Sequence, residues 1–379
     1  MDNAATSWPK APGVADAIAG LLQHGLASPG RGSHRLALAG SRMILSARQE
    51  LAGLFHLDDP LRVIFTANVT EAINLALWGW LRPGDQVVTT SMEHNAVMRP
   101  LRALARERGV RVHQVQADET GKLSLDMLAQ ALSSGASLMV VNHASNVVGT
   151  IAPLAEIARL CREHGVPVLV DVAQTAGVLP IDMQALDIDM LAFTGHKGLL
   201  GPTGTGGLCL GPRVDIERLH PLVNGGTGSR SEEESQPSFL PDRYESGTPN
   251  ILGIAGLTAA VRFLRQETVE RVRAHEQKLT AALLHSLQAI PRVRLYGTLE
   301  PVAQVAVVSF NIEGVDGAEV AFRLDKEYGI ISRVGLHCAP SAHRTIGTFP
   351  QGTVRLGPGY FTTLEDIDYV SGAIAAIAR

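Results

Sequence analysis

Cysteine is scarce in this chain. Only three of the 379 residues are cysteines, and Cys161, Cys209 and Cys338 stand far apart. An odd number at such wide spacing excludes a disulfide-stapled module and argues against a Cys-x-x-Cys metal site. Isolated thiols are typical of proteins in a reducing compartment. The sequence therefore predicts a cytoplasmic protein without a cysteine-bound metal.

Long apolar runs and an excess of one charge are also lacking. No run of about 18 apolar residues occurs, and residues 1–5 lack the basic and apolar regions of a signal peptide. Lys and Arg together number 33 against 37 for Asp and Glu, which gives a net charge of −4, and no long run of either sign appears. We therefore expect neither a nucleic acid nor a membrane as a partner.

Two glycine-rich nucleotide-binding motifs are absent as well. No G-x-G-x-x-G follows the first predicted strand, and no G-x-x-x-x-G-K-[ST] occurs. The glycine-rich residues 201–207 are better interpreted as a tight turn before a strand. A nucleotide-dependent oxidoreductase on a doubly wound sheet therefore remains an alternative without its main support.

What the chain does contain is an alternating apolar pattern. Apolar residues make up 45% of it, which suits one large α/β unit or two domains. Between about residues 60 and 212, short buried-strand runs alternate with Ala/Leu-rich helical segments, which predicts a large, mostly parallel sheet of seven strands. The strands are expected at 63–65, 86–90, 110–114, 137–142, 166–171, 190–193 and 206–210. Helices are expected at 70–81, 95–108, 124–132 and 154–163, the third capped by Ser124.

The pattern changes beyond residue 212. Residues 225–249 are polar and rich in Gly, Ser and Pro, which predicts a functional or interfacial loop, with a merely solvated excursion as the alternative. A long helical pattern at about 253–290 and strands near 303–312 and 354–356 then indicate an α+β domain. We expect a large domain over 12–255 and a smaller one over 256–379, completed by residues 1–11.

Polar side chains follow several predicted strands at their carboxyl ends, where open parallel sheets bind ligands. Thr70 is expected to cap a helix whose N–H groups favour a phosphate, and His94, Asp171 and Lys197 follow three other strands. Each alone has an ordinary explanation as a helix cap, a packed histidine or a surface lysine. Together on one rim they supply an anion pocket, an aromatic ring, a carboxylate and a lysine, which pyridoxal phosphate needs.

Eight motifs spread over nearly the whole chain resemble those of one family. They are DNAAT at 2–6, TEAIN at 70–74, EHNA at 93–96, SNVVGT at 145–150, DVAQ at 171–174, TGHKG at 194–198, ESGTPN at 245–250 and RVGLHCAP at 333–340. The combination resembles the cysteine desulfurases and selenocysteine lyases of the class V aminotransferase superfamily. The resemblance implies the α/β architecture of fold-type I pyridoxal phosphate enzymes, with a large sheet domain and a smaller α+β C-terminal domain.

The resemblance also implies how the cofactor is held. Lys197 would bond to it covalently, Asp171 would pair with its ring nitrogen, and His94 would stack on the ring. Gln174 would contact the ring hydroxyl, and Asn146 would lie beside that hydroxyl and the substrate. The phosphate would be held by the backbone at Val69, by Thr70, Thr194 and His196, and by Thr248 from a second subunit of a homodimer.

The nucleophile implied by the resemblance is Cys338. Positive charge on the neighbouring His337 and Arg333 would favour its thiolate form. A small buried cysteine is the ordinary alternative, and it is the interpretation that suits Cys161 and Cys209. The segment around Cys338 is similar to the short-loop type of desulfurase, in which the nucleophile moves little and a dedicated acceptor protein approaches it.

Two arginines would bind the substrate. Arg355 would clamp its carboxylate, and Arg333 would support the site. The chain departs from the family at Val69, where a hydroxyl residue is common, and at Pro358, which interrupts the segment after Arg355. The first departure removes one side-chain contact to phosphate, and the second leaves the local placement of Arg355 open.

The implied reaction converts L-cysteine into L-alanine and leaves a persulfide on Cys338. A sulfur-acceptor protein would take this sulfur for iron–sulfur cluster, thiolated nucleotide or molybdenum-cofactor assembly. L-Selenocysteine is the main alternative substrate, and it would give alanine and selenide. A transaminase or a kynureninase would not need the Cys338 thiol, so its presence weighs against both. A catalytically idle scaffolding subunit would need none of Lys197, Asp171 and Cys338, so the presence of all three weighs against that alternative.

Overall fold

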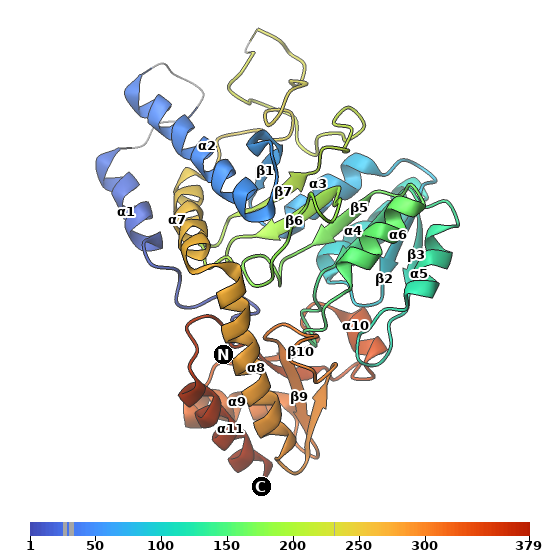
Figure 1. The fold of residues 1–379 in the computed structure, drawn as a ribbon, viewed down its shortest axis with the longest axis vertical. Coiled ribbons are helices and arrows are strands. Elements are labelled where there is room, and N and C mark those ends of the chain that lie inside the picture. The colour runs from blue at the N-terminus through green and yellow to red at the C-terminus, as the bar shows by residue number, and fades with distance from the viewer. Residues whose placement is uncertain (26–28, 30–33, 231) are drawn as a thin grey trace.

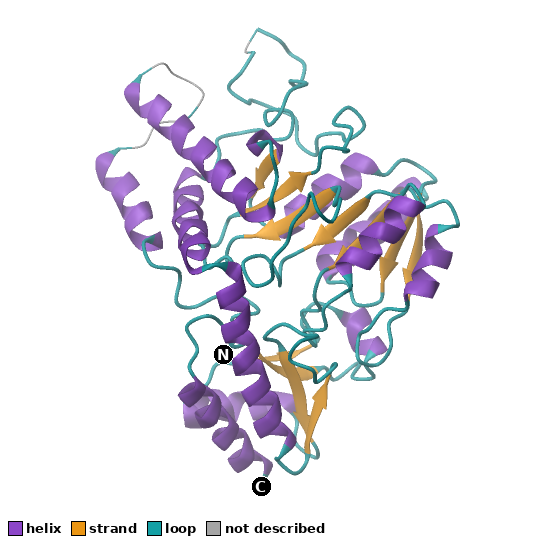
Figure 2. Cartoon of the chain, viewed as in Figure 1, coloured by secondary structure: helices purple, strands orange, loops and turns teal. Residues whose placement is uncertain are grey.

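A seven-stranded sheet forms the centre of the larger domain (Figures 1 and 2). The computed structural model describes residues 1–25, 29, 34–230 and 232–379. The strand order is β1-β7-β6-β5-β4-β2-β3, and only β7 runs antiparallel to its neighbours. The expected mostly parallel sheet is confirmed. Its strands are β1 (Val63–Thr66), β2 (Gln86–Thr90), β3 (Arg111–Val115), β4 (Leu138–Asn142), β5 (Val168–Asp171), β6 (Met190–Thr194) and β7 (Gly206–Leu210).

Helices cover both faces of this sheet. Within β5, Val168 and Val170 belong to the core on one face and Leu169 to the core on the other, because successive side chains of a strand point to opposite sides. Helices α3 (Val69–Trp80) and α4 (Asn95–Arg108) pack on the Leu169 face. The Val168 face carries α2 (Arg35–Phe55), α5 (Leu125–Leu132), α6 (Leu154–Glu163) and α7 (Ile251–Glu267). Ser124 caps α5, as expected.

The carboxyl ends of six strands meet at one rim of the sheet. Because β1 and β6 are both antiparallel to β7, β1 runs parallel to β6 and to the strands beyond it. Both faces are covered by helices, so ligand access is left to the strand ends. The fold therefore brings the residues that follow β1, β2, β4, β5 and β6 to the same rim.

A four-stranded antiparallel sheet forms the second domain, in the order β10-β11-β9-β8. Its core contains Phe310, Leu283 and Ile374, which come from the sheet and two helices. Its elements are α8 (Val269–Gln288), β8 (Val293–Tyr296), β9 (Val308–Ile312), α9 (Gly317–Tyr328), β10 (Arg333–Gly335), α10 (Pro340–Thr345), β11 (Thr353–Leu356) and α11 (Leu364–Ala378).

The long helix expected at 253–290 is two helices, α7 and α8. They are divided at Thr268, whose φ of +66° is left-handed and whose side chain caps α8 by accepting from the Arg271 N–H. Leu257 and Leu264 of α7 pack in the core of the large domain, so a division between residues 255 and 256 falls inside α7. Val272 of α8 still belongs to the large core, and the small core begins with Leu279 further along the same helix.

The strand expected from residue 303 begins only at Val308. Before this strand, the carbonyl oxygens of Val305 and Val307 pack against Gly149. A Cβ added at Gly149 would lie only 2.9 Å and 2.8 Å from these two oxygens. Gly149 has a φ of +77°, which suits glycine. Residues 303–307 therefore contact the large domain and do not extend the small sheet.

The N-terminal segment joins both domains. Met1 packs against the small core and Asp2 forms a β-bridge with Gly357, whereas Ala11 belongs to the large core just before α1 (Val14–His24). Residues 1–11 therefore complete the small domain only in part. The loop expected at 225–249 contains no helix or strand at residues 225–230 and 232–249, and Ser231 lies outside the described residues.

All three cysteines are free. Cys161 and Cys209 are buried in the large domain, as expected, and burial raises the pKa of Cys161 to about 12. The described residues contain no group of three or more His, Cys, Asp or Glu side chains that could hold a metal ion. Within the same part of the chain, none of the helices combines the length and apolar character that crossing a membrane requires.

Candidate active site

Asp171, which is buried, and Lys197, which is half-buried, form the centre of the strand-end rim. Asp171 ends β5 opposite Ala192 of β6, and Lys197 follows β6 by three residues. Burial lowers the pKa of Lys197 to about 8, although the Asp171 carboxylate opposes this shift. Burial also raises the pKa of Asp171, while an N–H from Ala173 and the Lys197 charge act in the other direction. The rim thus holds an amine that loses its proton readily beside a shielded carboxylate.

His94 lies at the start of α4 on the same rim. Its Nδ1 accepts the Ala96 N–H at 3.0 Å, so the proton of the neutral ring is on Nε2. Burial lowers the pKa of His94 to about 4, and the charges of Lys197, Arg333 and Arg355 add to the effect. The ring is therefore neutral at physiological pH, as stacking on a flat aromatic cofactor requires.

The first turn of α3 offers free N–H groups at the end of β1. The helix cap is Asn68, whose side chain accepts the Glu71 N–H at 3.0 Å, so the expected cap at Thr70 is wrong. An asparagine in extended backbone conformation begins the helix two residues earlier than the sequence pattern indicated. Val69 and Thr70 are the first two helical residues, whose N–H groups have no partner within a helix.

A glycine lets this helix end approach the neighbouring strands. Gly206 at the start of β7 pairs with Thr194 of β6 on one side and with Thr66 of β1 on the other. A Cβ added at Gly206 would lie 2.6 Å from the backbone of Asn68. The start of α3 and the end of β6 are therefore held together, which brings Val69, Thr70 and Thr194 to one side of the rim.

His196 and Thr194 differ in their hydrogen bonding. Thr194 is buried, and its hydroxyl donates to the Thr205 carbonyl at 3.4 Å. The buried Nδ1 of His196 has no hydrogen-bond partner within the described residues. Burial lowers the pKa of His196 to about 4, with Lys197 and Lys10 adding to the shift. A buried ring nitrogen without a partner can form a hydrogen bond with a bound ligand.

Thr248 lies near the β1 end of the rim. It is exposed and lines a cavity of about 750 Å³ whose other walls include Thr66, Glu71 and Thr205, whereas Lys197 is not among the lining residues. Within one chain, Thr248 and Lys197 therefore do not line a common cavity.

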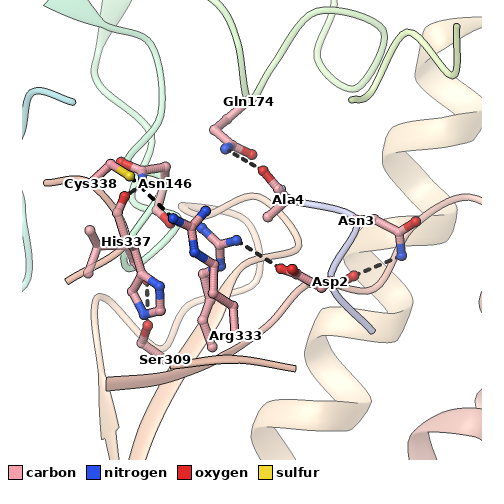
Figure 3. Close-up of polar contacts among 12 residues, drawn as sticks. Asp2, Asn3, Ala4, Asn146, Gln174, Ser309, Arg333, His337 and Cys338 are labelled. Carbon is pink, nitrogen blue, oxygen red and sulfur yellow. Dashed lines mark hydrogen bonds and ion pairs between the residues drawn. The ribbon is translucent and has the colours of Figure 1, made fainter. Parts of the chain in front are cut away.

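Gln174 and the N-terminal segment close another side of the site. The Gln174 amide donates to the Ala4 carbonyl at 3.0 Å (Figure 3). Gln174, Asn3 and Ala4 line the same small pocket as Lys197. Sequence reasoning gave this segment no site role, although its DNAAT motif was the available signal.

The two arginines lie opposite each other in the small sheet. Arg333 of β10 pairs with Arg355 of β11, which places both side chains on one face. Arg355 is 1% exposed, and its two Nη atoms donate to the Asn146 carbonyl and to Asp2 Oδ1, each at 2.9 Å. Arg355 Nε is buried and has no hydrogen-bond partner among the described residues, so the guanidinium keeps a donor beyond these two contacts. β11 is regular through Leu356, so Pro358 does not disturb Arg355.

Cys338 lies in a short loop between β10 and α10. The loop residues His337 and Cys338 have left-handed φ values of +47° and +59°, so the backbone holds two unfavourable conformations in succession. Two contacts from the large domain hold them: the Asn146 amide donates to the His337 carbonyl at 2.7 Å, and the Asn95 N–H donates to the Cys338 carbonyl at 2.8 Å. The loop is thereby fixed against the strand-end rim.

The Cys338 thiol is exposed and lies beside the Arg333 guanidinium. Arg333 Nη2 lies 3.2 Å from Sγ, as Figure 3 shows. The expected charge on His337 is absent: its ring is buried 3.0 Å from the Thr353 hydroxyl, and burial lowers its pKa far below the ordinary value. Cys338 in turn raises the pKa of Lys197, so the thiol and the amine lie within electrostatic reach of each other.

Comparison with known proteins places these residues in a family. The profile of "Aminotransferase class-V" matches residues 1–370. The chain belongs to the class-V aminotransferase family. Within it, the chain is 35% identical over 380 residues to a "Probable cysteine desulfurase" of Methanothermobacter thermautotrophicus, covering 99% of this chain and 94% of that protein.

Solved structures of this family agree with the fold. The apo cysteine desulfurase of Thermococcus onnurineus NA1 superposes with a TM-score of 0.93 at 30% identity, covering 100% of this chain and 94% of that one. A C-DES mutant with glycine covalently linked to its PLP cofactor has a TM-score of 0.83 at 26% identity, covering 98% and 95% of the two chains. The expected fold-type I architecture is confirmed.

Pyridoxal phosphate is the cofactor of this class-V family member, and the residues present fit it. Lys197 and Asp171 supply a readily neutral amine and a buried carboxylate. Across the described residues, four buried polar atoms of the site have no partner: His196 Nδ1, Asn146 Oδ1, Arg355 Nε and His337 Nδ1. Unpartnered buried polar atoms are costly unless a ligand satisfies them.

Proposed function

We propose that this chain is a pyridoxal phosphate-dependent cysteine desulfurase that converts L-cysteine into L-alanine and a persulfide on Cys338. The observation that carries the proposal is the Cys338 thiol, which is exposed, lies 3.2 Å from Arg333 and is close enough to Lys197 to affect its pKa. A transaminase has no use for a fixed thiol at this place. The names of the full-length relatives support the same activity.

Each residue of the rim has a role in this proposal. Bound pyridoxal phosphate supplies an aldehyde that captures the substrate amine and a ring that accepts the electrons of the Cα–H bond. Lys197 holds the cofactor and then removes the Cα proton, for which a lowered pKa is suited. Asp171 keeps the ring nitrogen protonated, and His94 stacks on the ring.

The remaining residues hold the cofactor and the substrate at its two ends. The Val69 backbone, Thr70, Thr194 and His196 bind the phosphate, and Gln174 contacts the ring hydroxyl. Asn146 lies beside the substrate and Arg333 supports the site, while Arg355 binds the substrate carboxylate.

Sulfur transfer follows proton removal. The Cys338 sulfur, which lies beside Arg333, attacks the substrate sulfur as a thiolate, so that an S–S bond forms and the Cβ–S bond breaks. The electron pair of the broken bond stays with the substrate carbon, and protonation completes L-alanine. Equal amounts of alanine and Cys338 persulfide in a single turnover, measured by amino-acid analysis and mass spectrometry, are expected. Alanine without persulfide would overturn the proposal.

The proposed enzyme works as a homodimer in which Thr248 completes the phosphate site of the other subunit. The support is that Thr248 is exposed and lines a cavity that its own Lys197 does not line. Mixing Lys197→Ala with Thr248→Asp protein should restore about a quarter of wild-type activity, since half of the exchanged dimers carry one intact site. Full activity of a purified monomer would contradict this arrangement.

The persulfide needs a protein that takes its sulfur away. The loop that carries Cys338 is tied to the large domain at two carbonyls, so the acceptor has to approach the thiol. We propose that the sulfur is then used in reactions that incorporate it into other molecules, such as iron–sulfur cluster assembly. The three free cysteines suit work in the reducing cytoplasm.

A further inference from the structure

A groove of about 560 Å³ opens directly beside the Cys338 loop. One wall is the start of α4, where Asn95 holds the Cys338 carbonyl, and another is α10, which begins two residues after Cys338 at Pro340. Gln114 and Gln116 of β3 and the segment after it form the floor. A molecule seated in this groove would therefore lie next to the reactive thiol.

Four arginines line the groove. Arg99, Arg102 and Arg106 are exposed and recur at helical spacing along one face of α4, and the exposed Arg344 comes from α10. No Asp or Glu lines the groove in the described part of the chain. The chain as a whole carries a net charge of −4, so this local positive charge runs against its overall balance. Clustered like charges favour an occupant of opposite sign.

Most of this positive charge is not neutralised within the chain. Arg106 pairs with Glu107 at 3.0 Å, and Arg344 lies over the Phe349 ring at 4.2 Å. Arg99 and Arg102 form no ion pair with any described residue. Guanidinium groups held on helices and left without carboxylates are suited to bind carboxylates of another molecule.

We propose that this groove, lined by Arg99, Arg102, Arg106 and Arg344, docks an acidic segment of the sulfur-acceptor protein. The proposal rests on the proposed function. The groove is larger than a small thiol needs, and its wall residue Asn95 holds the backbone carbonyl of Cys338. The acceptor's own thiolate then attacks the outer sulfur of the Cys338 persulfide, the S–S bond breaks, and Cys338 leaves as a thiolate. The acceptor becomes the persulfide without any net oxidation or reduction.

Short synthetic peptides test the docking. Each carries one cysteine beside a run of Glu, Gln or Lys, and each is added to enzyme that has reacted with L-cysteine and been freed of excess substrate. Mass spectrometry follows the persulfide on the peptide. At low ionic strength we expect the Glu peptide to reach half-maximal transfer at about a tenfold lower concentration than the Gln peptide, and this difference to collapse near 0.5 M salt.

A matched pair of variants locates the effect. Arg102→Glu with Arg344→Glu reverses two groove charges and should abolish the preference for the Glu peptide. Arg111→Glu with Arg271→Glu changes the net charge equally but lies at the start of β3 and on α8, so it should keep the preference. Loss of the preference in both variants, or in neither, would overturn the groove as the docking site.

Two further readouts separate this proposal from the proposed function. Binding of a fluorescent, cysteine-free Glu peptide reports the groove without chemistry, whereas alanine release with dithiothreitol reports the chemistry without the groove. Absent alanine together with tighter binding of the Glu peptide than of the Gln peptide contradicts the desulfurase activity alone. Equal binding of the Glu and Gln peptides contradicts the docking. A changed oligomeric state of the Arg102→Glu, Arg344→Glu variant also contradicts it, because the groove would then be a contact between copies of the chain.

Discussion

The large-domain and small-domain sides of the site differ in what positions their reactive side chains. On the large-domain side, Lys197 and Asp171 follow buried parallel strands, and burial is the first cause of both pKa shifts. On the small-domain side, Cys338 is exposed in a loop with two left-handed residues, and individual polar contacts to Arg333, Asn146 and Asn95 determine its position. The core of the sheet tunes the cofactor chemistry, and a few hydrogen bonds position the sulfur chemistry.

This difference has a functional consequence. A buried amine and carboxylate keep their electrostatic relation whatever approaches the surface, because solvent and salt screen them little. An exposed thiol can be reached by a second protein, which a sulfur-transfer step requires. Changes on the buried side should therefore abolish all chemistry, and changes on the exposed side should depend on the substrate and the acceptor.

Removal of the buried amine should have the largest effect. Lys197→Ala is expected to lower alanine formation on the order of ten-thousandfold, because Lys197 is the proton acceptor and the covalent anchor in the proposed mechanism. The visible absorbance of the bound cofactor and its trapping by borohydride should also vanish. Lys197→Arg serves as a control that keeps a positive charge. An unchanged, borohydride-reducible absorbance band in Lys197→Ala would show that another amine holds the cofactor.

Removal of the exposed thiol should separate two substrates. Cys338→Ser is expected to lose alanine release from L-cysteine on the order of a thousandfold, since serine cannot take up the sulfur. With L-selenocysteine the loss should be smaller, because selenium leaves more readily without a nucleophile. Cofactor absorbance should be kept in both cases. Wild-type alanine release from L-cysteine by Cys338→Ser would contradict the nucleophile.

The sequence could predict those features of the large-domain side that follow from periodic apolar patterns. The strands and the rim position of Lys197 and Asp171 follow from apolar runs and turn residues, since parallel strands bury both faces. The cap of α3 was missed because Asn68 and Thr70 are both good capping residues and the choice depends on backbone angles. The continuous helix at 253–290 was expected because Thr268 carries no sequence signal for a left-handed φ.

The exposed side was less predictable for a physical reason. The Cys338 loop is fixed by contacts between residues about 190 to 240 positions apart, such as Asn146 with His337 and Asn95 with Cys338. Sequence neighbours suggested a charge on His337, but burial against Thr353 keeps that ring neutral. The ion pair of Asp2 with Arg355 likewise joins the two ends of the chain. Such contacts exist only after both domains have packed.

Loss of the buried carboxylate should have a smaller effect than loss of the amine. Asp171→Ala is expected to lower turnover about a hundredfold, because the ring nitrogen would lose roughly two pKa units of support for its proton. The cofactor should stay attached through Lys197. Turnover and borohydride-trapped cofactor are measured on the same preparation. An Asp171→Ala enzyme with wild-type turnover would refute the assigned role.

The smallest effect concerns the pH at which the emptied enzyme captures its cofactor. Burial lowers the pKa of Lys197 from 10.5 to about 8, so the fraction of neutral, reactive amine rises tenfold per pH unit below pH 8 and levels off above it. The rate of cofactor capture, followed by absorbance, should show the same break. N-Acetyl-lysine in solution is the control, because its amine keeps an ordinary pKa and its rate should continue to rise through pH 9. The Asp171 carboxylate opposes the shift, so Asp171→Ala should move the break to lower pH. A break in the rate of cofactor capture above pH 9.5 in the wild type would show that the Lys197 amine is solvated in the empty enzyme. The large-domain side of the site would then not differ from the exposed side in the way described above.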